Sequence, residues 1–262
     1  MPIIQTETGY VYRSSKKVKR GGGFAKRFGV FLLILAVVCG VIYLSNVVDF
    51  AGVFKINKYQ IFDGQTYFAV AVKDGSSFAE VSSIAEELKG KNASGFVFKL
   101  DGTYYATANV YQNKTDAQKV CENIADEYNA TVLPIKLNKL VISSNYTQQE
   151  LSNIKNAIAV FEKSFDELYQ TSLSLDRGEI LSAEAKQKLQ VFKETCQMGK
   201  ETFAKVFANN CDVIVTNVKI LQSEVISNIG TLLLSDNLKG DIKYCASNLL
   251  SYFLTFEANV TK

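Results

Sequence analysis

The sequence predicts an α+β protein with three structured parts: an N-terminal transmembrane helix, a βαββαβ domain of the ferredoxin-like type, and a C-terminal antiparallel helical bundle. Three observations support this prediction: a long uncharged run near the N-terminus, alternating strand and helix periods in the middle, and four helical stripes after them. The predicted parts are a basic tail at 1–27, the transmembrane helix at 28–48, a linker at 49–64, the βαββαβ domain at 65–138 and the bundle at 146–262.

The run at 28–48 reads FGVFLLILAVVCGVIYLSNVV and contains no charged residue. As a helix rising 1.5 Å per residue, it matches a hydrocarbon core of about 30 Å. The tail before it holds seven lysines and arginines against a single acidic residue, Glu7. Because basic segments stay on the cytoplasmic side, we expect a single-pass protein of the cell membrane, with the lipid bilayer as a partner, a cytoplasmic tail, and residues 55–262 outside the cytoplasm.

The composition excludes several function classes. With 29 basic and 26 acidic residues the net charge is only +3, so no nucleic-acid partner is expected. Histidine is absent, which excludes Ser-His and Cys-His nucleophile pairs and His-ligated zinc. No phosphate-binding loop, dinucleotide fingerprint or metal-ligand spacing occurs. We therefore predict a protein that is not an enzyme, with no catalytic residues, cofactor or metal, although carboxylate-only and lysine chemistry stay open.

The first half of the middle domain reads as a strand followed by a helix. Residues 66–72 (TYFAVAV) alternate in the manner of a half-buried strand, and residues 73–77 (KDGSS) supply a turn and helix caps. The next apolar residues have helical spacing, and the predicted helix ends at Gly90. These apolar residues are Phe78, Val81, Ile84, Ala85 and Leu88.

The second half of this domain reads as a hairpin, a helix and a last strand. Residues 95–100 and 103–110 are strand-like and flank Asp101-Gly102, a dipeptide suited to a type I′ turn. A capping-box pattern starts a helix at Thr115, and Pro134 places the strand at 131–137 on an edge or at a bulge. The predicted order is βαββαβ.

Two helices with one apolar stripe each cover a single face of a four-stranded sheet, so the other face is expected to be open. Strict alternation assigns to the open face the side chains of Tyr67, Ala71, Lys99, Tyr105, Thr107 and Asn109. Aromatic rings cover sugar C–H surfaces, while amides and hydroxyls bond sugar hydroxyls. These six residues are the candidate glycan-binding site, and the alternative is an ordinary solvated sheet face.

The segment at 65–138 resembles the SPOR domain, a family that recognises peptide-free glycan strands of peptidoglycan. The resemblance rests on the strand at 68–72, Ser76-Ser77, Ile84-Ala85-Glu86-Glu87-Leu88, and the run at 104–111 followed by Thr115-Asp116-Ala117. It implies a bacterial, non-catalytic peptidoglycan-binding protein of cell division or sporulation, anchored in the membrane. Ala71 stands where the family commonly has Gln, and Tyr105 and Thr107 replace commonly basic residues. The alternative is therefore a membrane-anchored structural or protein-interaction factor whose SPOR-like domain has lost sugar binding.

After residue 146 proline is absent and the hydrophobic period settles at three to four residues. Four stripes begin near Leu151, Ala185, Ile214 and Leu238, and short breaks separate them. This pattern predicts an antiparallel bundle whose stripes form its core. A docking surface for an unknown protein partner is the other interpretation of the same stripes.

Overall fold

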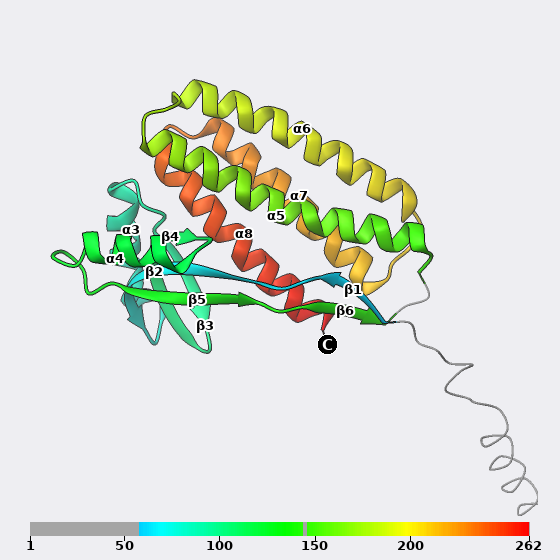
Figure 1. Ribbon diagram of the computed structural model, residues 1–262, viewed down its shortest axis with the longest axis horizontal. Coiled ribbons are helices and arrows are strands. Elements are labelled where there is room, and N and C mark those ends of the chain that lie inside the picture. Colours follow the sequence, from blue (N-terminus) through cyan, green and yellow to red (C-terminus); the bar gives the residue numbers. More distant parts are fainter. Residues whose placement is uncertain (1–57, 144–145, 262) are drawn as a thin grey trace, which may run out of the picture. The chain divides into compact units, whose positions relative to one another are not determined.

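The computed structural model describes residues 58–143 and 146–261 of the protein (Figure 1). Within these ranges the chain forms two sheets and six helices. The sheet region contains β1 (Lys58–Phe62), β2 (Gln65–Gly75), α3 (Phe78–Gly90), β3 (Phe96–Leu100), β4 (Thr103–Tyr111), α4 (Lys114–Asn123), β5 (Thr131–Leu137) and β6 (Leu140–Ser143). The bundle contains α5 (Gln148–Asp176), α6 (Ser182–Val206), α7 (Val213–Leu234) and α8 (Leu238–Val260).

The predicted fold class needs a correction at its membrane element. The expected transmembrane helix at 28–48 lies outside the described residues, and none of the helices in 58–143 and 146–261 is both long and apolar enough to cross a bilayer. The class that the structure supports is α+β, and the described residues form two sheets and six helices; none of these helices could span a membrane.

The four-stranded sheet has the order β3-β4-β2-β5, and all neighbouring strands are antiparallel. In this split arrangement β4 lies between the two strands that α3 connects, as the order βαββαβ requires for a ferredoxin-like sheet. Helices α3 and α4 pack on β2, with α3 also on β4 and α4 also on β5. They cover one face, as the two apolar stripes predict.

A second sheet was not predicted from the sequence. Strands β1 and β6 pair antiparallel, with Tyr59 opposite Ile142. Residues of β1 fall in the predicted linker at 49–64, and β6 lies between the two predicted domains. The two strands are short and lie far apart in the chain, so no local hairpin signal marks their pairing.

The bundle helices begin and end close to the predicted stripes. Helix α5 starts at a capping box, in which Thr147 and Glu150 exchange hydrogen bonds between side chain and backbone. Its buried face repeats at helical spacing through Leu151, Ile154, Ile158 and Phe161. The four predicted bundle helices are confirmed as α5, α6, α7 and α8.

The sheet and the bundle share one hydrophobic core. Helix α8 packs on β3, β4 and β5, and α5 packs on β1 (Figure 1). Aromatic contacts join the layers, with ring centroids 4.8 Å apart for Phe62 and Phe253 and 5.2 Å apart for Phe96 and Tyr244. The segments 65–138 and 146–262, expected as separate domains, therefore belong to one compact unit.

Gly95 is a tight point in this arrangement because it precedes β3 and lies against α3. Its φ is +56°, and a Cβ atom added there would lie 2.2 Å from the carbonyl oxygen of Ala85. Gly102 in the β3–β4 turn also has a positive φ, +85°, but has open space around its Cβ position. A side chain at Gly102 would meet backbone strain alone, whereas a side chain at Gly95 would meet both backbone strain and a steric clash.

We expect Gly95→Ala to lower the free energy of unfolding by about 3 kcal/mol, because left-handed strain and overpacking add. Gly102→Ala is the matched control and should cost only about 1 kcal/mol, from strain alone. Urea unfolding of both variants measures the difference. Equal losses at the two positions would contradict the close approach of β3 and α3.

Candidate functional site

The structure separates the six predicted glycan-binding residues into buried and accessible groups. Tyr67, Ala71 and Thr107 are buried, with exposed fractions of 1%, 4% and 0%. Tyr105 and Asn109 are half-buried, and Lys99 is exposed. The six residues therefore do not form one accessible surface.

The burial follows from strand pairing across the sheet. Thr107 of β4 lies opposite Phe96 of β3 and opposite Ala71 of β2, so these three residues share a face. Phe96 contacts Tyr244 of α8 edge to face. The Thr107 hydroxyl donates a hydrogen bond of 2.9 Å to the carbonyl oxygen of Phe96. This hydroxyl is therefore used within the sheet.

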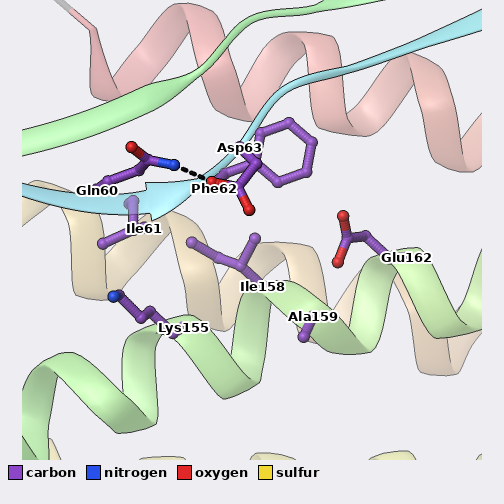
Figure 2. Close-up of a pocket in the computed structure, with 8 residues that line it drawn as sticks. All are labelled: Gln60, Ile61, Phe62, Asp63, Lys155, Ile158, Ala159 and Glu162. Atoms are coloured by element: carbon purple, nitrogen blue, oxygen red, sulfur yellow. Dashed lines mark hydrogen bonds between the residues drawn. The ribbon is translucent and has the colours of Figure 1, made fainter.

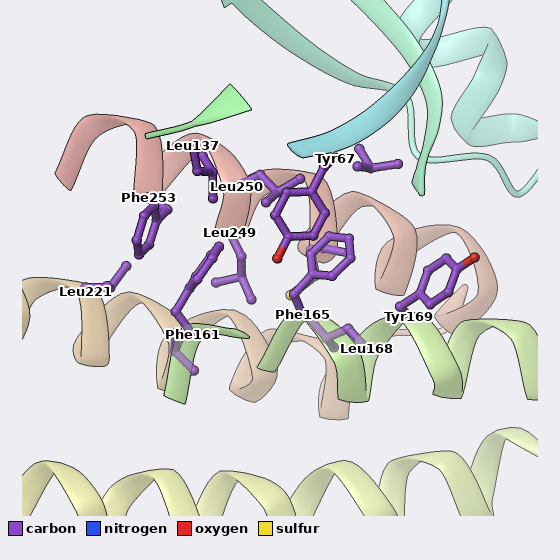
Figure 3. Packing of buried hydrophobic residues seen from close by; sticks show 14 of the residues in the cluster. Tyr67, Leu137, Phe161, Phe165, Leu168, Tyr169, Leu221, Leu249, Leu250 and Phe253 are labelled. Carbon is purple, nitrogen blue, oxygen red and sulfur yellow. The ribbon is translucent and has the colours of Figure 1, made fainter. Parts of the chain in front are cut away.

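Tyr67 is the centre of the contact between β2 and the bundle. Figure 3 shows its ring directed from β2 toward Phe165 of α5, and the two ring centroids are 4.5 Å apart. Ile135 of β5 lies opposite Tyr67 in the sheet and is equally buried. A side chain in this position stabilises the packing of the layers and is not accessible to an external ligand.

A register shift explains why alternation fails along β4. Asn109 pairs with Val70, whereas Thr107 pairs with Ala71, so the register slips between two adjacent residues of β2. Adjacent strand residues point to opposite faces, and therefore Asn109 and Thr107 do so as well. The prediction that Tyr105, Thr107 and Asn109 share one face is wrong for Asn109.

The predicted open face is also wrong, because α5 and α8 cover it. The prediction counted only the two helices within the βαββαβ segment as cover for the sheet. The apolar stripes of the later helices were assigned to a separate core, but part of that core is the sheet itself. A face bearing Tyr67, Ala71 and Phe96 supplies the apolar surface that α5 and α8 need.

Lys99 remains accessible and has a local partner. Its ammonium group lies 5.1 Å from the ring centroid of Tyr104, within cation–π range. Both residues lie at the exposed end of the β3–β4 hairpin. This pair is a small polar and aromatic surface without the neighbouring residues that the prediction placed beside it.

Acidic residues lie close to the hydroxyl end of Tyr67. Burial raises the pKa of Tyr67 well above its ordinary value of 10.0, and the charges of Asp166 and Glu162 on α5 raise it further. Burial also raises the pKa of Glu162, and Asp166 and Asp63 add to this shift. Gln112 donates a hydrogen bond to Asp166. This edge of α5 thus holds several carboxylates near one phenol.

An open pocket of about 230 Å³ lies beside these acids (Figure 2). Lys155, Ile158, Ala159 and Glu162 of α5 line it opposite Gln60, Ile61, Phe62 and Asp63. Gln60 donates a hydrogen bond to Asp63. The lining offers one ammonium group and two carboxylates, and within 58–143 and 146–261 no group of three metal-ligating side chains is found.

Two polar contacts between sheet and bundle were not predicted from the sequence. Ser94 and Ser247 are fully buried and share a hydrogen bond of 3.0 Å. Glu257 of α8 is almost fully buried and accepts hydrogen bonds from the backbone and side-chain nitrogens of Asn138. Serine and glutamate on a helix ordinarily indicate a solvated face, so no local signal marks these residues as interface.

Comparisons with protein-family models, with curated proteins and with solved structures find no match to this chain. The resemblance to the SPOR family therefore stays a prediction.

We expect Tyr67→Ala to lower the free energy of unfolding by about 3–5 kcal/mol, as for other large aromatic residues truncated in a core. Tyr105→Ala, at a half-buried position on the same sheet, is the control and should cost about 1 kcal/mol. Chemical denaturation of the two variants gives both values. A small loss for Tyr67→Ala would show that the bundle does not cover the sheet in solution.

We expect the buried phenol of Tyr67 to make stability fall at alkaline pH. Its pKa is higher in the folded than in the unfolded state, so its contribution is complete below about pH 10 and is lost as pH rises above that value. Tyr67→Phe should reduce the slope of unfolding free energy against pH by up to about 1.4 kcal/mol per pH unit. Urea titrations between about pH 9 and 11 measure the slopes, with Tyr105→Phe as control.

Proposed function

We propose that this protein is a non-catalytic structural or protein-interaction factor. In this proposal the SPOR-like sheet is a scaffold that supports a helical bundle, and the sheet does not bind sugar on its second face. The observation that supports it is the cover of that face by α5 and α8, which buries Tyr67, Ala71 and Thr107. The helical surface on the side away from the sheet is then available to a protein partner.

Glycan binding on the covered face would require the sheet and the bundle to separate. Separation would expose Tyr67, Phe96 and Phe165, and each large apolar side chain loses about 1.5–3 kcal/mol on exposure. Buried polar groups such as Ser94 and Ser247 would also lose their partner. A sugar contacting a few exposed side chains does not offset such a loss.

Glycan binding at the hairpin end is the competing hypothesis. Lys99 and Tyr104 lie opposite each other and share one face there, whereas Tyr105 faces the other side, and an aromatic ring beside a cation suits a polar ligand. The surface lacks the contribution of Tyr67 and Thr107, because those side chains pack inside. A scaffold role accounts for the burial of these residues, whereas a sugar-binding role does not.

The described pocket adds no catalytic argument. Its polar residues Lys155, Glu162 and Asp63 form no nucleophile–base pair in hydrogen bond contact among the contacts of the described residues. Glu162 has a raised pKa because it is partly buried near other acids, which is a common result of packing. We therefore keep the proposal non-catalytic.

A sedimentation assay with peptide-stripped peptidoglycan sacculi tests the proposal. We expect the full-length protein to co-sediment no more than an unrelated protein of similar charge, and Lys99→Ala with Tyr104→Ala should leave the result unchanged. Circular dichroism confirms that the double variant is folded. Saturable retention that the double variant weakens at least tenfold would contradict the proposal and support glycan binding at the hairpin end.

A further inference from the structure

The exposed apolar side chains of the described residues are concentrated on one part of the bundle. Of nine large apolar residues with high exposure among the described residues, seven lie between the N-cap of α6 and the end of α7: Leu181, Val191, Met198, Val206, Val213, Ile220 and Leu234. Helix α6 packs on α5 and α7 and lies at the edge of the bundle (Figure 1). Three of the seven, Val191, Met198 and Val206, lie on α6 itself.

Five residues form an outward stripe along α6. Successive positions three or four residues apart share one helix face, and Val191, Thr195, Met198, Thr202 and Val206 follow this spacing. The hydroxyls of Thr195 and Thr202 donate hydrogen bonds to the carbonyl oxygens of Val191 and Met198, at 3.1 and 2.9 Å. With their hydroxyls bonded inside the helix, the threonines add little polarity to the stripe.

Charges border the stripe but do not interrupt it. Lys188 lies at one end and pairs with Glu167 of α5 at 2.9 Å. Glu194 and Lys205 lie along one side, and Glu194 accepts a hydrogen bond from Gln190. Glu201, three residues after Met198, lies on the same side of the helix as Glu194, so the ionisable groups nearest Met198 border the stripe on that side. Such a face can meet a copy of itself without burying a charge.

The order of residues in the stripe is the same in both directions: Val, Thr, Met, Thr, Val. In an antiparallel pair related by a two-fold axis, each residue before the axis faces its counterpart after it. An axis between Met198 and Gly199 brings Val191 opposite Val206 of the second copy, and Thr195 opposite Thr202. Glu194 then lies within about one helical turn of both Lys205 and Glu201 of the second copy, at the exposed border of the contact.

Gly199 is an independent indication of a second helix. It lies inside α6 with ordinary helical backbone angles, and a Cβ added there meets nothing within 4 Å. Glycine destabilises a helix interior relative to alanine, so the fold of one chain gives no reason for it. A helix that crosses α6 at this point gives a reason, since the missing side chain allows the two backbones to approach closely.

We propose that α6 forms the interface of an antiparallel homodimer with its two-fold axis between Met198 and Gly199. The 25 residues of α6 span about 37 Å, so two such helices and their borders bury roughly 1,000 Å² in total. This area is at the lower end for specific complexes, and the dimer is accordingly weak, with a dissociation constant in the micromolar range. The proposal is independent of the sheet and of sugar binding, and a negative sacculus assay leaves it intact.

Cysteine cross-linking in the full-length protein tests the position of the axis. The exposed Cys211 is first replaced by serine in every variant, because it lies at the end of the α6–α7 loop. With copper–phenanthroline as oxidant, Met198→Cys should give a disulfide-linked dimer in most of the protein. Leu234→Cys, a more exposed position at the end of α7, is the control and should give little dimer. Equal cross-linking at both positions would overturn the proposal.

Sedimentation equilibrium of further full-length variants separates the interface from the fold. Met198→Glu should raise the dissociation constant at least tenfold, whereas Leu234→Glu should leave it unchanged. Gly199→Ala should move the urea midpoint upward, since it removes a helix-interior glycine, and yet weaken the dimer. Dimers unaffected by Met198→Glu, or a wild-type monomer at high micromolar concentration, would overturn the proposal; the monomer would leave the face to a different protein.

Discussion

The contact between the second face of the four-stranded sheet and the helices α5 and α8 is the interaction on which the rest of the structure depends. The sheet carries Tyr67 and Phe96 on this face, and the helices carry Phe165 and Tyr244 opposite them. Neither layer has enough apolar partners without the other, because the helix stripes also need a surface to pack on. Burial of large aromatic residues from both layers is the main stabilising contribution at this contact.

Polar contacts make this packing specific. The buried hydrogen bond between Ser94 and Ser247 requires the loop before β3 to lie over one turn of α8. Nearby, the Lys243 ammonium donates to the carbonyl oxygen of Asn92 at 2.9 Å and pairs with Asp176 of α5. Each of these groups loses a partner if α8 slides along the sheet, and for the buried serines an unpaired hydroxyl costs about 1–3 kcal/mol. Such contacts select one position of the bundle among many with similar apolar area.

Covering the sheet changes which surfaces are accessible for function. Tyr67, Ala71 and Thr107, three of the six side chains expected to read sugar, are inside, while the outward side of the bundle presents a stripe of uncharged side chains along α6 that includes Met198. In this arrangement the helical layer binds a partner and the sheet supports the helices. The hairpin end with Lys99 and Tyr104 is a small accessible remainder of the predicted site.

The order of strands and helices and the four bundle helices followed from local patterns, because periodicity and capping depend on residues close in the chain. The turn at Asp101-Gly102 is of this kind. The predicted cap at Thr115 is wrong, because the side chain of Asn113 caps α4 by accepting a hydrogen bond from the backbone of Asp116. The register shift beside Ala71, the pairing of β1 with β6 and the cover over Tyr67 depended on contacts between distant segments. An amphipathic stripe shows that a face is buried but does not name its partner, so only the tertiary structure decided that the sheet and the bundle bury each other.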